Sequence, residues 1–269
     1  MPSINWHEFL MPYAQAVDEL CGKFKSLDKE YRFKTLHSPI EHVQGRVKRV
    51  GSILEKARRK RVPVNKIVEG IRDIAGIRII CQFVEDIGAV VQIVRRHEGF
   101  DLRVLDEQDY ITNAKPSGYR CYHIHVEYPI FTMDGMKKIP VEIQIRTMSM
   151  DFWATIEHSL KYKYNGKIPE ALRGRLIHTA EAAFQLDKEM STIRDEIIET
   201  QKVIRVKNDL ADQILKKIQD LHSMVKTESI NELNKEFYGI YNENDVAKLN
   251  AFNYKLDTMM RLYSTESFE

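Results

Sequence analysis

The sequence predicts an α/β (α+β) fold followed by a C-terminal helical extension. Between residues 77 and 146, apolar runs typical of strands are interrupted by one segment of helical periodicity, residues 85–97. The segment Met133-Asp-Gly-Met136 predicts a hairpin turn between two of these runs, so part of the sheet is antiparallel. After residue 201 the pattern is helical throughout. We therefore assign residues 1–201 to one domain and residues 202–269 to a helical extension of unknown role.

Length and composition suit one elaborated α/β domain with an appendage. The 269 residues are 43% hydrophobic, enough for a sizeable core, and the net charge of +2 predicts no particular partner. The three cysteines are far apart and form no CxxC pair, which argues against a disulfide framework or a thiolate metal site. With no signal peptide and no apolar run of about 18 residues, we expect a cytoplasmic protein that does not span a membrane.

Two segments precede the predicted sheet. Residues 5–33 predict one helix or two, because apolar side chains recur at helical spacing and Pro12 would lie at a kink or in a late first turn. We interpret this element as an outer helix for packing or for oligomer formation. Residues 37–45 predict a loop with room for a short helix capped by Ser38.

A strongly basic segment follows. Residues 46–61 carry eight Lys or Arg against one acid, Glu55, a local net charge of +7. Within it, residues 48–61 predict a helix. This helix presents either a solvated basic face or a grip for a polyphosphate, because Arg and Lys both bind phosphate oxygens. Four side chains share that face at helical spacing, namely Ser52, Lys56, Arg59 and Lys60.

The middle of the chain alternates between helix and strand. Residues 64–75 predict a helix, and residues 77–83 predict a central strand because they are apolar on both faces. Residues 85–97 predict a crossover helix and residues 101–106 another strand. The polar stretch at 106–117 is long enough for a lid or a binding loop.

The densest group of functional side chains lies between residues 115 and 123. Pro116 fixes its own φ and Gly118 tolerates φ > 0, so the pair predicts a turn. Around this turn the sequence places Lys115, Tyr119, Arg120 and His123.

Two strands, predicted at 120–128 and 138–146, flank the hairpin. An ordinary half-buried strand exposes its polar face to water, whereas three different functional side chains in alternation can line a site. On the second strand these are Glu142, Gln144 and Arg146. Antiparallel pairing is expected to bring together Glu142, Gln144, His123 and His125.

The last part of the domain is helical. Residues 148–165 predict a helix with Phe152, Ile156 and Leu160 facing inward. Pro169 starts a further helix, which could run past residue 200, and a break is expected near 226–229.

Two carboxylates, Asp73 and Glu142, are candidates for a metal site. Hard oxygen ligands beside a basic phosphate grip suggest Mg²⁺ with a nucleoside triphosphate. The chain has no P-loop, no GxGxxG after a strand, no HExxH and no GxSxG motif. Spacing alone therefore predicts a Mg²⁺-dependent enzyme that acts on nucleotides or phosphates, with His125 and His158 as structural residues.

Five longer motifs follow one another in order along the chain, namely HSPIEHVQGRVK, SILEKARRK, RDIAGIRIICQF, KPSGYRCYHIHVEYP and VEIQIRTMSMDFWATIEHSLKYKYNG. Over roughly residues 5–200 the chain thereby resembles a known family, the small alarmone synthetases, which are the stand-alone synthetases of the RelA/SpoT family. The resemblance implies a nucleotidyltransferase-like mixed β-sheet of about five strands surrounded by helices, and often a homotetramer. It implies a (p)ppGpp synthetase of the stringent response, which transfers the β,γ-pyrophosphate of ATP to the 3′-hydroxyl of GTP, GDP or GMP and releases AMP.

The resemblance also implies roles for residues at matching positions. The catalytic residues would be Glu142, Asp73, Tyr119 and His123, with Mg²⁺ bound by Asp73 and Glu142. The ATP site would comprise Arg46, Ser52, Lys56, Arg59, Lys60 and Arg78, with the adenine between Arg46 and Arg78. The acceptor site would comprise Lys115, Tyr119, His123, Gln144 and Arg146. Glu142 would also take the proton of the 3′-hydroxyl.

Two alternatives remain at this stage. A toxin-type member of the family would act on the 3′ end of tRNA or on adenosine nucleotides. A non-catalytic regulator would use the basic and aromatic surface to bind single-stranded RNA. The chain carries no hydrolase motif, so we expect that it does not degrade its product.

One departure from the family pattern concerns regulation. Some members are activated by their own product in a cleft between subunits, and the corresponding positions here are His42, Gln44 and Asp151. An Asp beside a phosphate-rich ligand is repulsive unless it pairs with guanine N–H groups. The sequence therefore predicts weak or absent activation by product.

Overall fold

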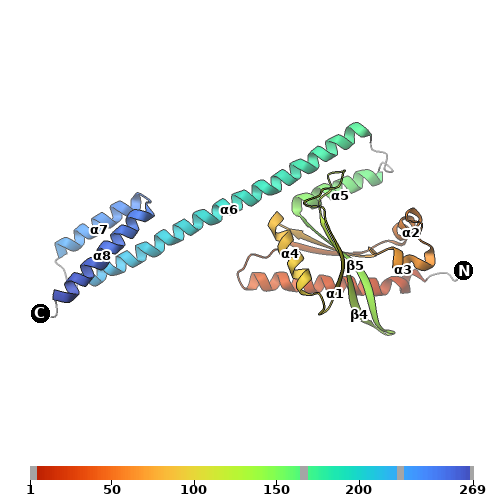
Figure 1. Ribbon diagram of the computed structural model, residues 1–269, viewed down its shortest axis with the longest axis horizontal. Helices are drawn as coiled ribbons and strands as arrows, with labels where there is room; N and C mark the ends of the chain where they lie inside the picture. Colours follow the sequence, from red (N-terminus) through yellow and green to blue (C-terminus); the bar gives the residue numbers. More distant parts are fainter. Residues whose placement is uncertain (1–4, 164–168, 223–226, 267–269) are drawn as a thin grey trace. The chain divides into compact units, whose positions relative to one another are not determined.

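Two compact units make up the chain in the computed structural model, which describes residues 5–163, 169–222 and 227–266 (Figure 1). Unit 1 comprises Met1–Ser191 and unit 2 comprises Thr192–Glu269. The boundary falls within one long helix, α6 (Glu170–Leu221). The sequence-based division at residue 201 also falls within this helix.

Unit 1 is built on a five-stranded mixed sheet, as the family resemblance implies. Its strand order is β1-β2-β5-β4-β3, with β2 and β5 parallel and every other neighbouring pair antiparallel. β4 and β5 form the predicted hairpin, and its register pairs Thr132 with Gly135. The strands are β1 (His42–Val47), β2 (Ala75–Cys81), β3 (Arg103–Asp109), β4 (Tyr122–Thr132) and β5 (Gly135–Thr147).

One face of the sheet is apolar and carries the core. Along β5, Val141, Ile143 and Ile145 are fully buried, while the residues between them belong to the opposite face. Two helices, α1 (Trp6–Phe33) and α4 (Val84–Arg96), share one hydrophobic core with the sheet (Figure 1). Burial of one face in this way leaves the other face available for a site.

α1 is one continuous helix of 28 residues, although the sequence leaves open one helix or two. The Asn5 side chain caps it by accepting a hydrogen bond from the backbone N–H of Glu8. Pro12 lies inside the helix without ending it. The side chains that pack against the sheet recur at helical spacing, namely Tyr13, Ala16, Val17, Leu20 and Phe24.

Two short predictions before β2 are wrong. The loop expected at 37–45 leads instead into the edge strand β1, whose backbone pairs with β2. The helix expected at 64–75 is reduced to the 3₁₀ turn η1 (Val64–Lys66) and α3 (Ile67–Gly70). The backbone is extended at the next residue, Ile71, which ends the helix before the strand begins. The basic helix, by contrast, forms as α2 (Val50–Arg59).

β3 extends three residues beyond its predicted end, to Asp109, so the loop before β4 is shorter than expected. The next helix, α5 (Met148–Lys163), also differs from the prediction. Phe152 is 69% exposed and Ile156 is 42% exposed, whereas both were expected inward. The buried Trp153 sets the orientation of α5 because its indole Nε1–H donates to the carbonyl of Leu176 at 3.0 Å.

Unit 2 has a core of its own. Apolar side chains of the C-terminal half of α6 pack against α7 (Thr227–Asn242) and α8 (Val246–Glu266), and Ile214, Leu221 and Leu249 are fully buried there. α7 already includes 227–229, where the sequence predicts a break, and residue 226 lies outside the described residues. Across the described helices of both units, none combines the length and the apolarity that crossing a membrane requires.

Candidate active site on one face of the sheet

The strand register places the polar side chains of the sheet in two adjacent rows on one face. Partners across a sheet lie on the same side, so each row can be read from the pairing. The first row is Arg46, Gly76, Glu142, His125 and Asp106. The second row is Gln44, Arg78, Gln144, His123 and Gln108. The predicted proximity of Glu142 and Gln144 to His125 and His123 is confirmed.

A cavity of about 190 Å³ opens on these rows. It contains both candidate metal ligands, Asp73 and Glu142, although they are 69 residues apart in the sequence. Gly76 lies between them in the lining, and the absence of a side chain there leaves room above β2. A larger hollow of about 560 Å³ beside the start of α1 has one carboxylate, Glu8, and none of the paired groups of the sheet face.

Asp73 lies just before β2 and is held by two lysines. Its Oδ2 accepts hydrogen bonds from Nζ of Lys48 and from Nζ of Lys56, the latter at 2.5 Å. Burial alone would raise the pKa of Asp73, but the two lysines outweigh it and hold the pKa below its ordinary value. Asp73 is therefore a carboxylate at neutral pH.

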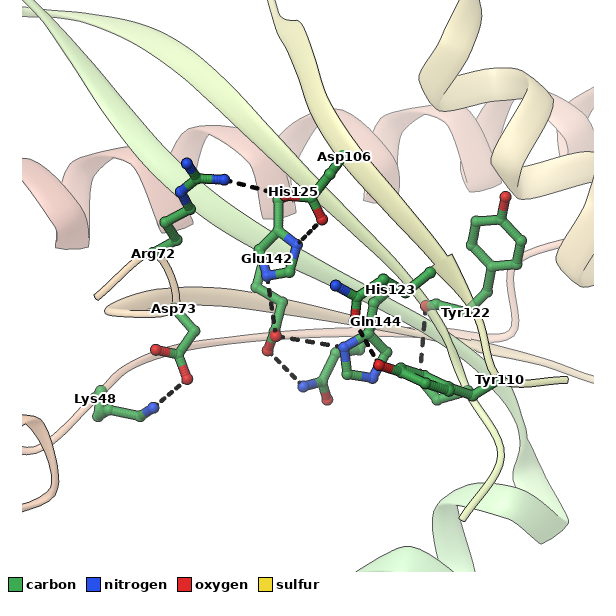
Figure 2. A network of polar contacts seen from close by, with 12 residues as sticks. Lys48, Arg72, Asp73, Asp106, Tyr110, Tyr122, His123, His125, Glu142 and Gln144 are labelled. Atoms are coloured by element: carbon green, nitrogen blue, oxygen red, sulfur yellow. Dashed lines mark hydrogen bonds and ion pairs between the residues drawn. The ribbon is translucent and has the colours of Figure 1, made fainter. Parts of the chain in front are cut away.

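Glu142 lies at the centre of the sheet with three donors around it (Figure 2). Its Oε1 is 3.4 Å from Nδ1 of His123 and 3.3 Å from Nε2 of His125, and its Oε2 accepts a hydrogen bond from Nε2 of Gln144 at 2.6 Å. Burial alone would raise the pKa of Glu142, but the two imidazoles and the amide hold it far below its ordinary value. The group is thus ionised at neutral pH.

These two carboxylates fit a magnesium ion. Oδ1 of Asp73 is buried and has no hydrogen-bond partner among the described residues. A buried oxygen without a partner is costly, so it suits a ligand that the cavity admits. The described residues contain no cluster of three or more His, Cys, Asp or Glu that could hold a metal. Mg²⁺ commonly uses one or two carboxylates together with substrate phosphates, so two suffice.

The predicted turn at 116–118 forms, with Gly118 at φ +85°. It brings Tyr119 beside the sheet, where its hydroxyl is 3.0 Å from Nε2 of His123. Burial raises the pKa of Tyr119 well above its ordinary value, so its hydroxyl stays protonated. The ammonium of Lys115 lies 5.0 Å from the centre of the Tyr119 ring and 4.2 Å from that of Tyr110. A cationic and aromatic corner therefore adjoins Glu142.

Two arginines on the same face share a carboxylate. Oδ1 of Asp151, in the first turn of α5, is 2.5 Å from Nη2 of Arg146 and 3.3 Å from Nη1 of Arg78. Arg146 is buried, with 2% of its surface exposed, whereas Arg46 on the edge strand is exposed. Arg146 therefore lies below the surface that a ligand would meet, and Arg46 and Arg78 lie nearer to it.

The four residues predicted to bind phosphate do not lie together: one reaches the site and three are exposed. Lys56 turns toward the sheet and pairs with Asp73. Ser52 and Arg59 on α2 and Lys60 just after it are exposed, and none of the three lines the cavity. The structure thus brings Lys56 into the site and leaves the other three at its rim or beyond.

Two polar residues of the site, Lys48 and Asp106, were not predicted, and a third, His125, was predicted there as a structural residue only. Lys48 pairs with Asp73 from the segment before α2, and a basic run gives no signal that singles it out. Asp106 reaches His125 because of a β-bulge in β3, which the sequence does not reveal. Nε2 of His125 lies 3.3 Å from Oε1 of Glu142, and the interaction with that carboxylate raises the pKa of His125.

The positions expected to govern product activation lie on two elements. His42 and Gln44 are exposed on the edge strand β1. Asp151 is already paired with two arginines, so its charge is partly offset within the chain. Weak or absent activation by product stays a prediction.

Known proteins share much of the sequence of this chain. Residues 45–167 match the family described as a region found in RelA / SpoT proteins. The chain is 52% identical to the GTP pyrophosphokinase YjbM of Bacillus subtilis (strain 168) over 213 residues, which are 79% of this chain and all of that protein. It is 42% identical to the GTP pyrophosphokinase YwaC of the same strain over 195 residues, 72% of this chain and 92% of that one.

Solved structures agree with the sequence matches. The crystal structure of small alarmone synthetase 1 from Bacillus subtilis bound to its product pppGpp superposes with a TM-score of 0.68 at 54% identity, covering 71% of this chain and 97% of that one. A GTP pyrophosphokinase family protein from Streptococcus pneumoniae gives a TM-score of 0.69 at 50% identity, covering 74% and 97%. About a fifth of this chain has no counterpart in YjbM.

Proposed function

The chain belongs to the small alarmone synthetases of the RelA/SpoT family, and from this membership we propose that it transfers the β,γ-pyrophosphate of ATP to the 3′-hydroxyl of GTP, GDP or GMP. It is accordingly a GTP pyrophosphokinase that makes (p)ppGpp. The observation that carries the proposal is the cavity shared by Asp73 and Glu142, with lysines and arginines around it. A reaction that moves a charged pyrophosphate needs such surroundings, because it depends mainly on positioning and charge neutralisation.

ATP is proposed to bind along the first strands and α2. Arg46 and Arg78 would stack on the two faces of the adenine, which suits planar guanidinium groups. Gln44 and Gly76, which line the cavity between these arginines, leave space there. The triphosphate would extend toward Lys56, with Ser52, Arg59 and Lys60 at its outer end. These exposed side chains would have to turn inward on binding.

Mg²⁺ is proposed to be held by Asp73 and Glu142 together with the phosphates of ATP. When bound, it would neutralise charge on the pyrophosphate and lower the pKa of the acceptor hydroxyl. The unpartnered Oδ1 of Asp73 supports its part in this role. Lys48 and Lys56 keep Asp73 ionised and orient it, so they act on the same site.

The acceptor is proposed to bind at the cationic and aromatic corner. Tyr119 would stack on the guanine, and Lys115 and His123 would contact phosphates of the acceptor or the donor. Gln144 holds Glu142, and Arg146, which is buried, would act through its pairing with Asp151. A guanosine nucleotide placed in this way would have its ribose near Glu142.

The chemical step can be written with these residues. The 3′-oxygen forms a bond to the β-phosphorus of ATP, and the bond from that phosphorus to the α,β-bridging oxygen breaks. The electron pair of the broken bond leaves with AMP. The proton of the 3′-hydroxyl passes to Glu142, which is ionised at neutral pH, and its release from the hydroxyl would be eased by the bound Mg²⁺.

A turnover assay tests the proposed reaction. The purified protein is incubated with Mg²⁺ and γ-labelled ATP, and in parallel reactions with GMP, GDP, GTP or bulk tRNA. Label on a guanosine 3′ position, with an equal amount of AMP released, is the expected result. Label only on tRNA would place the chain among the toxin-type enzymes. Absence of transfer to every acceptor would leave a nucleotide- or RNA-binding protein.

Assembly as a homotetramer is part of the proposal. Phe152 and Ile156 on α5 are exposed apolar side chains where the sequence predicts burial, and contact with another subunit would cover them. Light scattering coupled to gel filtration is expected to give four times the 31.5 kDa mass of the chain. A monomer at micromolar concentration would contradict the assembly without affecting the proposed reaction.

A further inference from the structure

We propose that His125 is a positioning residue for Glu142, and that Asp106 in turn orients His125. The inference rests on the proposed function, in which Glu142 accepts the proton of the acceptor hydroxyl. His125 would fix the carboxylate so that one oxygen is occupied and the other stays available. None of the roles derived from the resemblance includes His125 or Asp106.

The contacts form a chain of three side chains across three strands (Figure 2). Nδ1 of His125 lies 2.8 Å from Oδ1 of Asp106, and its Nε2 lies 3.3 Å from Oε1 of Glu142. The other oxygen of Asp106 accepts a hydrogen bond from Nη1 of Arg72 at 3.2 Å. Each member is therefore held from both sides.

The position of Asp106 depends on a β-bulge in β3. β3 and β4 pair regularly through Val104 and Val126, and the register then shifts by one residue so that Asp106 faces His125. Without this bulge the residue opposite His125 would be Leu105, which cannot hydrogen-bond through its side chain. Bulges commonly re-aim side chains beside functional sites.

The two neighbours of the imidazole are both carboxylates, so each ring nitrogen has an acceptor in front of it. Ionised carboxylates only accept hydrogen bonds, so the ring satisfies both when it donates from both nitrogens. The geometry thus places His125 as a link between two carboxylates rather than as a packed ring.

The consequence for Glu142 follows from counting acceptor sites. A carboxylate oxygen can accept about two hydrogen bonds. Oε1 faces two imidazoles, with Nδ1 of His123 at 3.4 Å and Nε2 of His125 at 3.3 Å. Oε2 accepts one bond, from Gln144, and keeps capacity for a further partner. With Oε1 turned to the two imidazoles, Oε2 is the oxygen that stays open toward the cavity, where the acceptor hydroxyl and the proposed Mg²⁺ would lie.

Three substitutions test this role. His125→Leu removes both donors at similar volume, and His125→Gln keeps one N–H that can reach Glu142. His158→Gln changes an exposed histidine on α5 and serves as the matched control. We measure kcat and KM for pyrophosphate transfer, calorimetric affinity for a non-hydrolysable ATP analogue, and the midpoint of thermal unfolding.

The expected result is a split between kcat and binding. His125→Leu should lower kcat about tenfold or more, the usual effect of losing a partner of a site ligand, while the KM for ATP and the analogue affinity stay within about twofold. His125→Gln should recover most of kcat, and His158→Gln should match the wild type. The unfolding midpoint should not follow the order of the kcat values.

Several outcomes would overturn the inference. Unchanged kcat in His125→Leu would remove the role, and so would equal losses in His125→Leu and His125→Gln that track the unfolding midpoint. Weakened analogue binding at unchanged kcat would make His125 a binding residue instead. If the Leu variant does not fold, His125→Asn, whose amide is too short to reach Glu142, takes its place. Failure of the wild type itself to transfer pyrophosphate would overturn the proposed function, which is a distinguishable result.

Discussion

At the scale of single residues, Asp73 shows how the site is kept charged. Two lysines converge on one oxygen of this carboxylate, and the side chains of Lys48 and Asp73 are only 14% and 11% exposed. Electrostatic attraction between largely buried charges is stronger than at the surface, but it stabilises the protein only while both partners are present. Asp73 therefore contributes to folding as well as to the proposed metal site.

Asp73→Asn is expected to lower the free energy of unfolding by about 1–3 kcal/mol, because it leaves two half-buried ammonium groups without their counter-charge. It should also abolish pyrophosphate transfer, because the proposed metal site loses a ligand. Urea denaturation measures the first effect. Asp134→Asn is the matched control, since Asp134 pairs with Lys137 but is 77% exposed. Equal small effects of the two substitutions would contradict this account.

The residue scale also shows how much of the site the sequence predicts. The turn at 133–136 sets the hairpin register, and the register alone brings Glu142 and Gln144 opposite His125 and His123. Asp73 is a candidate metal ligand from the sequence itself, and the resemblance implies the same role for it. Asp106 and Lys48 escape prediction because one depends on a bulge and the other on the path of the chain before α2. Neither feature has a periodic signature in the sequence.

At the scale of elements, hydrogen bonds to the buried Asp187 connect α6 with the end of β5 and the start of α5. Asp187 accepts hydrogen bonds from Thr147, at the end of β5, and from Ser149, at the start of α5. These hydroxyls stabilise its charge only in part, so burial still raises the pKa of Asp187 above its ordinary value of 3.8. The folded state thus binds a proton at Asp187 more tightly than the unfolded chain does.

The stability that Asp187 contributes decreases as the pH rises. Stability from this site is fully present below about pH 3.8 and declines as the pH rises through the raised pKa of Asp187. Asp187→Asn keeps an acceptor oxygen but carries no charge, so it should unfold at a higher temperature than the wild type at pH 7. The gain should shrink toward pH 4. A gain that is constant with pH, measured by thermal unfolding from pH 4 to pH 8, would contradict the assignment.

The turn before Tyr119 gives a second test at this scale. Gly118 has φ +85°, and a Cβ built on it would lie 2.6 Å from Cβ of Ala180 on α6. Gly118→Ala should therefore lower the free energy of unfolding by about 2–5 kcal/mol, combining left-handed strain with overpacking. Gly99→Ala, at φ +81° with nothing within 4 Å, should cost only about 1–2 kcal/mol. Similar losses in the two variants would argue against the clash.

Elements with long, regular apolar patterns are predicted correctly from the sequence, whereas a short edge strand and the inward face of α5 are not. α1, α4 and the β4–β5 hairpin form as predicted because each buries a periodic apolar face. β1 was missed because it is an edge strand in which only Val43 is buried, so the alternation is weak. The inward face of α5 was misjudged because Trp153, rather than Phe152, packs against α6.

At the scale of the whole molecule, the two units have separate cores. The buried side chains of unit 2 begin at Leu210 and end at Leu256, and none belongs to the core of unit 1. All residues of the proposed site lie in unit 1. Unit 2 therefore has no residue in the proposed chemistry.

A chain ending at residue 201 is expected to keep kcat within about twofold and to retain the unfolding transition of unit 1. The full chain should show a second transition, which the shortened chain lacks. Phe237→Ala is a point-mutant control, because Phe237 is 2% exposed in the core of unit 2. It should weaken only the second transition, by about 3–5 kcal/mol. Loss of turnover on truncation, seen in the same transfer assay, would assign unit 2 a part in activity.

Glu142, held at the middle of the polar sheet face, is proposed to take part in the transfer itself. The most direct test compares wild type with Glu142→Gln, which keeps the shape of the side chain but cannot accept the proton of the 3′-hydroxyl. Label transfer from γ-labelled ATP to a guanosine nucleotide should fall by about a hundredfold or more. Affinity for a non-hydrolysable ATP analogue without Mg²⁺ should change by less than about threefold. Turnover within tenfold of the wild type would contradict the claim.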